Sequence, residues 1–253
     1  MKRIGIVRNW TWPDLMQQTH GCSGVWEGIH FLETWEKPCD YLVVLNNLPE
    51  NRSVDLAPER VIRIVQEPPT EFFKAWHTNP PYASITLSCD PEKQGTSYRR
   101  HHPMVPWHIN RNYDFLSAAP VPAKKSWLSW ITSTKAILQG HQTRMGFLHR
   151  INGRIPGLEL IGTSINHIIQ PQQREENAVL QTKLGFRFVE DKWAGLAPYR
   201  YSLAIENFSG PDYWTEKLAA CYLAWTLPIY YGCTNIEEYF PPESFIRINI
   251  EKP

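Results

Sequence analysis

The sequence lacks a strong excess of charge, a long apolar run and a paired arrangement of cysteines. A net charge of +1 provides no overall field for nucleic acid or a membrane surface, so an anionic ligand must be held by a few placed cations. No run reaches the roughly 18 consecutive apolar residues of a membrane helix. Five scattered cysteines without C-x-x-C spacing predict reduced thiols in a cytoplasm rather than disulfides or a zinc site: Cys22, Cys39, Cys89, Cys221 and Cys233.

Several motifs of nucleotide and metal enzymes are absent as well. The sequence has no G-x-G-x-x-G and no G-x-x-x-x-G-K-[ST], which argues against a dinucleotide oxidoreductase and a P-loop enzyme. It has no D-x-D, which weakens a metal-dependent sugar transferase, and no G-x-S-x-G. His101, His102 and His108 lack the spacing of a metal site, so we expect them at the surface. The sequence therefore predicts neither a bound metal nor a cofactor.

Short apolar strands alternate with helical patterns along the chain, which predicts parallel sheets covered by helices on both faces. A stretch rich in alanine and proline, Tyr113 to Lys125, reads as a linker. We expect an α/β protein of two doubly wound, Rossmann-like lobes, residues 1–115 and 124–253, with a cleft between them. The expected strands are Arg3–Val7, Tyr41–Leu45, Val61–Val65, Ser84–Ser88, Trp127–Thr132, Leu158–Ile161, Tyr201–Ile205, Pro228–Tyr230 and Phe245–Ile248.

The strand Tyr201–Ile205 and the helix after it carry the strongest functional signal. The strand ends in Glu206 and Asn207, and a helix is expected from Asp212, as N-cap, to about Trp225. Leu218, Cys221, Tyr222 and Trp225 would form its buried stripe.

Lys217 falls in the first turn of that helix. A lysine there is unfavourable unless an anion shares the site, because helix N-termini carry partial positive charge. A solvated lysine would be the better interpretation if it stood alone, but its place beside Glu206 and Asn207 favours a bound phosphate or diphosphate.

Two further residues have a functional and an ordinary interpretation. Arg144 is expected in the first turn of a helix beginning near Gln142, where a guanidinium could grip diphosphate oxygens, although on this segment alone a surface arginine is the better interpretation. Glu67 follows an apolar strand and precedes Pro68 and Pro69. It is either a partly desolvated general base with a raised pKa or a loop acid facing water, and the residue pattern leaves both open.

Together these segments resemble the α-1,3-fucosyltransferase family (glycosyltransferase family 10). The resemblance is long and nearly gapless over Tyr199–Asn207, Asp212–Leu218, Leu227–Gly232 and Asn235–Ile246. It is weaker over 127–161, and the N-terminal half carries it only in Gln66-Glu67-Pro68.

The resemblance implies a GT-B fold with an N-terminal acceptor lobe and a C-terminal lobe for GDP-fucose. It implies an inverting displacement, without an enzyme-bound metal, that moves L-fucose onto a glycan hydroxyl, in α-1,3 linkage to GlcNAc or Glc. By position, Glu67 resembles the general base, Arg144 and Lys217 the diphosphate clamp, Glu206, Asn207 and Tyr213 the fucose contacts, and Glu216 the ribose contact.

Two alternatives remain: a transferase for a different nucleotide sugar, and a non-catalytic glycan-binding protein on the same fold. The expected partners are a nucleotide-sugar donor and a glycan acceptor, without nucleic acid. Animal members carry a membrane anchor and stem that this sequence lacks, so we expect a bacterial, cytoplasmic enzyme, with peripheral contact to the inner membrane face left open. Family members usually continue past the strand at 245–248, so a shortened or truncated chain is also expected.

Overall fold

A computed structural model of the protein describes residues 1–10, 13–33, 38–49, 52–163 and 178–252. They form two compact units. The first comprises Met1–Pro106, Arg111–Ala118 and Gly210–Thr215, and the second comprises Trp107–Asn110, Ala119–Ser209 and Glu216–Pro253. Each unit is built on one mainly parallel sheet, which confirms the predicted α/β class. The boundaries at 115 and 124 stay a prediction.

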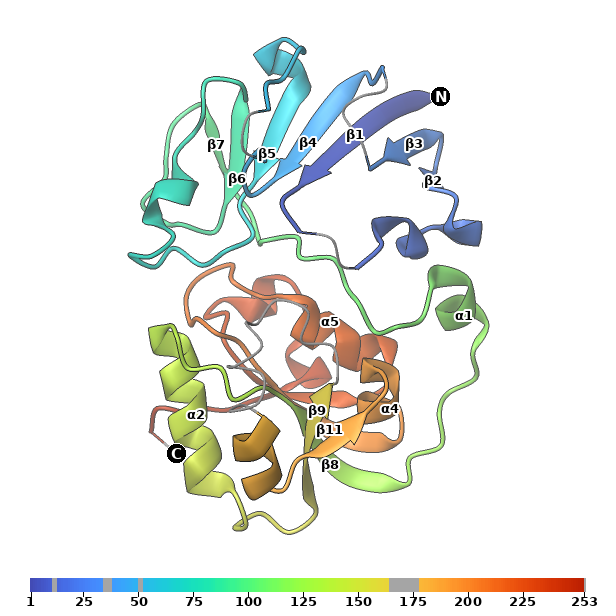
Figure 1. Cartoon of the computed structure of the whole chain (residues 1–253), viewed down its shortest axis with the longest axis vertical. Coiled ribbons are helices and arrows are strands. Elements are labelled where there is room, and N and C mark those ends of the chain that lie inside the picture. The colour runs from blue at the N-terminus through green and yellow to red at the C-terminus, as the bar shows by residue number, and fades with distance from the viewer. Residues whose placement is uncertain (11–12, 34–37, 50–51, 164–177, 253) are drawn as a thin grey trace. The chain divides into compact units, whose positions relative to one another are not determined.

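The sheet of the first unit has seven strands in the order β2-β3-β1-β4-β5-β6-β7 (Figure 1). All neighbours pair in parallel except β2 and β3, which form an antiparallel hairpin. Among the described residues of this unit α1 is the sole α-helix, so 3₁₀ turns stand where the sequence predicted covering helices. The strands and helix are β1 (Lys2–Arg8), β2 (Val25–Trp26), β3 (Ile29–Leu32), β4 (Tyr41–Leu45), β5 (Val61–Ile64), β6 (Ile85–Ser88), β7 (Tyr98–Arg100) and α1 (Tyr113–Ala118). The 3₁₀ turns are Leu15–Gln18, His20–Cys22, Pro58–Arg60 and Lys74–His77.

The second unit has a six-stranded, fully parallel sheet in the order β10-β9-β8-β11-β12-β13. In chain order within the unit this is 3-2-1-4-5-6, the strand order of the dinucleotide-binding fold. Its elements are β8 (Ser126–Ile131), α2 (Gln139–Ile151), β9 (Leu158–Thr163), β10 (Arg187–Val189), α4 (Lys192–Leu196), β11 (Tyr199–Ile205), α5 (Glu216–Leu223), β12 (Leu227–Tyr231) and β13 (Ile246–Arg247). Residues 178–183 are also helical, and 3₁₀ turns occur at Ile236–Glu238 and Pro242–Ser244.

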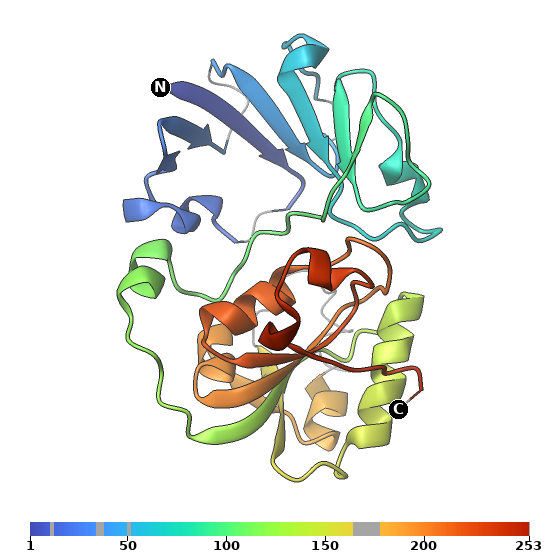
Figure 2. The ribbon, with the colours of Figure 1, turned by 180° about the vertical axis from the view of Figure 1, so that it is seen from behind.

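Buried apolar residues of the central strands explain why these segments form sheets. In the first unit Val7, Leu42, Val44 and Val61 pack into one cluster. In the second, strand residues such as Trp130 and Leu203 pack against Phe147 and Leu148 of α2. The C-terminal segment closes this core: Ile250 is buried in it, its carbonyl accepts a hydrogen bond from Arg150 of α2, and the segment runs beside α2 (Figure 2).

The predicted helix from Asp212 to Trp225 is wrong at both ends. Helix α5 begins at Glu216, because Asp212 adopts a left-handed backbone (φ 60°) and its carboxylate pairs with Arg100 instead of capping a helix. Trp225 follows the helix, also with positive φ, and is 57% exposed rather than part of a buried stripe. Leu218 and Cys221 are buried as predicted.

Two other local predictions need correction. The helix expected near Gln142 begins three residues earlier, at Gln139, so Arg144 lies in its second turn. The stretch read as a linker opens with the helix α1, and at its end the backbone N–H of Lys125 donates to the carbonyl of Pro198 at 2.8 Å. All five cysteines are free thiols. Within the described residues, no helix is both long and apolar enough to cross a bilayer.

Candidate active site

Polar side chains meet in the second unit where the strand order reverses, between β8 and β11. In open parallel sheets ligands bind outside the carboxyl ends of the strands at this reversal. The segment after β8 brings Ser133 and Lys135 to it, and β11 ends there in Glu206 and Asn207. Sequence and topology therefore select the same edge of the sheet.

Arg144 reaches this edge from α2. Its Nη1 donates to Asn207 Oδ1 at 2.6 Å, and its Nη2 donates to oxygens of Ser133 and Lys135 at 3.2–3.3 Å. The residue is 5% exposed, and its buried Nε has no partner in the described part of the chain. Burial lowers the pKa of the guanidinium to about 10, which leaves it charged at neutral pH.

No carboxylate of the described residues forms an ion pair with Arg144, and every oxygen that it binds is neutral. A buried charge without a counter-ion is costly, so its persistence points to an anion that completes the site. A guanidinium with a free N–H edge is suited to phosphate oxygens.

A close backbone contact places α2 against the end of β11. A Cβ added to Gly140 would lie 1.6 Å from the carbonyl oxygen of Asn207, so only glycine fits at this point of the helix. Gly232, after β12, is equally restricted: an added Cβ would lie 2.4 Å from Cγ of Glu206. These two glycines allow α2 and the end of β12 to approach Asn207 and Glu206 closely.

Lys217 lies in the first turn of α5, as the sequence predicts, but its charge is already partnered. Its Nζ donates to Glu206 Oε2 at 3.1 Å and lies 3.9 Å from Glu216 Oε1. Glu206 is almost fully buried, so this pair is well shielded from water. Burial by itself would lower the pKa of Lys217, yet the two carboxylates outweigh it and raise the pKa.

A second lysine, Lys192, joins this group from the start of α4. Its Nζ lies 3.6 Å from Glu216 Oε1 and 2.5 Å from Nε2 of His108. The sequence reasoning missed Lys192 and expected His108 at the surface, where the structure shows it half-buried. The signal was available, because Lys192 is also a cation in the first turn of a helix, the pattern that selected Lys217.

Glu67 lies in the first unit, half-buried, just after β5. The corner that carries it is fixed from several sides: the N–H of Gln66 donates to Asn46 Oδ1 at 2.8 Å, and the Gln66 side chain bonds to Trp10 and to the carbonyl of Met104. The carboxylate thus sits on a rigid turn, as expected of a general base, while its raised pKa stays a prediction.

Tyr213 also belongs to the first unit, in the loop before α5. It is 4% exposed. On one side of it Asp212 forms a two-pronged pair with Arg100, and on the other Trp214 stacks on His102 with ring centroids 4.2 Å apart. His102 is thus held in a stack rather than free at the surface.

The structure brings together five of the seven predicted site residues. Within the second unit Arg144 bonds to Asn207, and Lys217 contacts both Glu206 and Glu216. The two groups meet at the consecutive residues Glu206 and Asn207. Glu67 and Tyr213 belong to the first unit, which is described by itself.

A family model, glycosyltransferase family 10 (fucosyltransferase) C-term, matches residues 121–250 of the chain, the part that carries this cluster. The chain belongs to glycosyltransferase family 10.

Curated relatives match over shorter stretches. The α-(1,3)-fucosyltransferase FucT of Helicobacter pylori is 34% identical over 70 residues, which is 28% of this chain and 14% of the relative. An α-(1,4)-fucosyltransferase of Arabidopsis thaliana is 37% identical over 62 residues, 22% of this chain and 16% of the relative. Human 4-galactosyl-N-acetylglucosaminide 3-alpha-L-fucosyltransferase FUT6 is 42% identical over 57 residues, 21% of this chain and 16% of the relative. The matched stretches therefore span less than a fifth of these relatives.

Solved structures extend the likeness to the whole chain. A crystal structure of an α1,3-fucosyltransferase with GDP-fucose aligns with a TM-score of 0.52 at 17% identity, covering 100% of this chain and 76% of that one. The structure of an α1,3-fucosyltransferase with GDP gives the same TM-score and 75% coverage of that chain. At this identity the likeness concerns the fold, and it confirms the predicted GT-B class.

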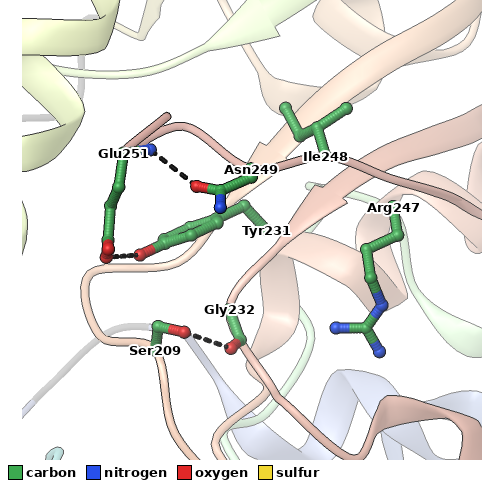
Figure 3. A pocket seen from close by; sticks show the side chains of 7 residues that line it. All are labelled: Ser209, Tyr231, Gly232, Arg247, Ile248, Asn249 and Glu251. Atoms are coloured by element: carbon green, nitrogen blue, oxygen red, sulfur yellow. Dashed lines mark hydrogen bonds between the residues drawn. The ribbon is translucent and has the colours of Figure 1, made fainter. Parts of the chain in front are cut away.

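The family 10 domain also contains a pocket of about 220 Å³ at the carboxyl ends of β12 and β13 (Figure 3). The pocket borders the predicted site, because Gly232 lines the pocket and lies against Glu206. Tyr231 bonds to Glu251 on one side, and the Arg247 guanidinium on the other pairs with Glu237. The remaining lining residues are Ser209, Ile248 and Asn249.

Proposed function

We propose that this family 10 protein is an inverting fucosyltransferase that moves L-fucose from GDP-fucose onto a hydroxyl of a glycan, in α-1,3 linkage to GlcNAc or Glc. The observation that carries the proposal is the buried Arg144 guanidinium, which pairs with no carboxylate of the described residues and lies where the strand order reverses. The structure of an α1,3-fucosyltransferase with GDP-fucose supports the donor, and the names of the curated relatives support the transfer. They come from a bacterium, a plant and mammals, so a bacterial, cytoplasmic origin stays a prediction.

In this proposal Arg144 and Lys217 bind the diphosphate. As the bond between the anomeric carbon and the β-phosphate oxygen breaks, its electron pair leaves with GDP, and the growing negative charge is held by the two cations. Preplaced charges of this kind are usually worth roughly 10²–10³ in kcat each. Lys217 then exchanges part of its contact with Glu206 for phosphate oxygens.

Glu67 is proposed as the general base. It takes the proton of the acceptor hydroxyl while that oxygen attacks the anomeric carbon from the face opposite GDP, which inverts the configuration. Asn207, Glu206 and Tyr213 are proposed fucose contacts and Glu216 the ribose contact. We assign the reaction no enzyme-bound metal.

Calorimetric titration with GDP tests the clamp. We expect Arg144→Met to weaken GDP binding roughly 10- to 100-fold, the range of a lost hydrogen bond to a charged group. Arg154→Met removes an exposed arginine of the same unit and should leave the affinity unchanged. Lys217 is tested as Lys217→Met with Glu206→Gln, because removing the lysine alone would leave a buried carboxylate without its partner. Unchanged GDP affinity in both variants would refute the clamp.

The donor itself is tested on the unaltered protein. Ligands that bind the folded state raise its melting temperature, so GDP-fucose should give a larger shift than UDP, dTDP or CMP sugars. A larger shift with a UDP sugar would favour the transferase of a different nucleotide sugar. Binding of glycan without donor turnover would favour the non-catalytic protein.

A further inference from the structure

Four charged side chains of the second unit form a row at the start of α5. Lys192 Nζ lies 3.6 Å from Glu216 Oε1, and the same oxygen lies 3.9 Å from Lys217 Nζ. Lys217 in turn lies 3.1 Å from Oε2 of the buried Glu206. The signs of the charges alternate along the row, so each carboxylate has a lysine beside it.

Lys192 is held in this row by contacts that do not depend on Glu216. The N-cap Asp191 starts α4, and the backbone N–H of Lys192 donates to Asn110 Oδ1 at 3.2 Å. The ammonium also contacts Nε2 of His108. Because an ammonium can only donate, His108 accepts through Nε2 and carries its proton on Nδ1. The lysine is therefore fixed beside Glu216, with only 20% of its side chain exposed.

We propose that Lys192 is a positioning residue that neutralises and holds Glu216, so that the site keeps an excess positive charge for a nucleoside diphosphate. This inference rests on the proposed function. The two carboxylates of the row balance the two lysines, and Arg144, whose partners among the described residues are all neutral, provides the excess. Without Lys192 that excess disappears, and Glu216 would turn fully to Lys217, which lies within reach.

The test compares three ligands that differ only in phosphate: GDP, GMP and guanosine. We expect Lys192→Met to weaken GDP binding roughly 10-fold, GMP binding less and guanosine binding not at all, because Coulomb attraction grows with ligand charge. Lys192→Arg should restore most of the GDP affinity. Lys183→Met, at an exposed lysine of the same unit, is the matched control and should change none of the three.

A double mutant separates this role from a merely structural one. In a Glu216→Gln background there is no carboxylate to neutralise and the site keeps one positive charge in excess without Lys192, so the double variant should favour GDP over guanosine by nearly as much as the unaltered protein does. An equal loss for GDP and guanosine, or a double variant that favours GDP over guanosine as little as Lys192→Met does, would overturn the inference. If Lys192→Met does not fold, Lys192→Gln replaces it in the same comparisons. Failure of the unaltered protein to bind GDP would instead refute the proposed function.

Discussion

Two arginines of this chain are buried to a similar degree, and comparing them shows what sets Arg144 apart. Arg63 is 2% exposed, and its three nitrogens bind the carbonyls of Asn46 and Thr78 and the amide oxygen of Asn47. Arg63 therefore has a complete set of partners and a structural role. Arg144 is buried as deeply, but its Nε is left without a partner in the described chain, at the edge of the sheet where ligands bind. The sequence alone shows neither how the Nε of Arg144 is partnered nor that Arg144 lies at the ligand-binding edge of the sheet.

Glu67 is the other residue whose role can be isolated. Glu67→Gln keeps the size and polarity of the side chain but removes its ability to take a proton. We expect the rate of transfer from GDP-fucose to fall by roughly 10²–10⁴, the usual contribution of a general base, with GDP affinity unchanged. The measurement is product formation followed by mass spectrometry in EDTA-containing buffer, with calorimetry for GDP.

The matched control is Glu71→Gln, at an exposed glutamate a few residues along the same unit. It should leave both transfer and binding unchanged. If Glu67→Gln transfers fucose at the rate of the unaltered protein, another group accepts the proton, and Glu67 is a loop acid facing water.

At the scale of elements, the sequence predicted the buried strands well and the edges of the helices poorly. Tyr41–Leu45 was predicted to the residue, because a continuous apolar run bounded by turns indicates a buried parallel strand. The strands that the sequence did not predict are short and lie at or near sheet edges. A strand there is less buried and does not require a continuous apolar run. These strands are β2, β3, β7 and β10. The start of α5 was misplaced because the partner of Asp212, Arg100, is 112 residues away in sequence.

Gly140 offers a test of how α2 positions the site. Its close approach to Asn207 leaves no room for a methyl group, so Gly140→Ala must move the helix or the end of β11. We expect a loss of roughly 1–3 kcal/mol in the free energy of unfolding, the usual cost of overpacking, together with weaker GDP binding because Asn207 bonds to Arg144. Urea denaturation and calorimetry measure the two effects.

Gly146 provides the control within the same helix. An added Cβ there meets only the Arg150 side chain, at an ordinary 3.6 Å. Because alanine favours helices over glycine, Gly146→Ala should raise stability by about 1 kcal/mol and leave GDP binding unchanged. If both substitutions behave alike, the contact between Gly140 and Asn207 has no role in the site.

At the scale of the whole molecule, the alternation of strands and helices was enough to predict the fold class. The location of the site depends in addition on the strand order, which the structure provides. The order reverses once in each sheet, between β1 and β4 and between β8 and β11. The sequence could place Glu206 and Asn207 at a strand end but could not show that β8 is the neighbour of β11. That pairing brings Ser133 and Lys135 to the site, which the sequence reasoning did not include.

The stability of the molecule should depend on pH through buried histidines, and burial lowers the pKa of His77 in the first unit as well as those of His102 and His141. Burial lowers the pKa of His102, in the first unit, to about 4 from an ordinary value of 6.5. Burial, followed by the charges of Arg144, Lys135 and Lys217, lowers the pKa of His141 to about 4 as well. Between about pH 4 and 6.5 the unfolded chain therefore binds more protons than the folded one, so stability rises with pH across this window and is lost as the pH falls.

Each histidine can contribute a slope of up to about 1.4 kcal/mol per pH unit in that window. His141→Gln keeps an acceptor for the N–H of Leu138, and His102→Phe keeps a ring against Trp214, yet neither variant titrates there. Urea denaturation at several pH values should show a shallower slope for each variant and the shallowest for the double mutant. Carboxylates that titrate near pH 4 are the same in the unaltered protein, the two single variants and the double mutant. The differences between their slopes of stability against pH therefore report the histidines alone. Equal slopes in all four would mean that both rings reach solvent and that these histidines do not cause the acid sensitivity.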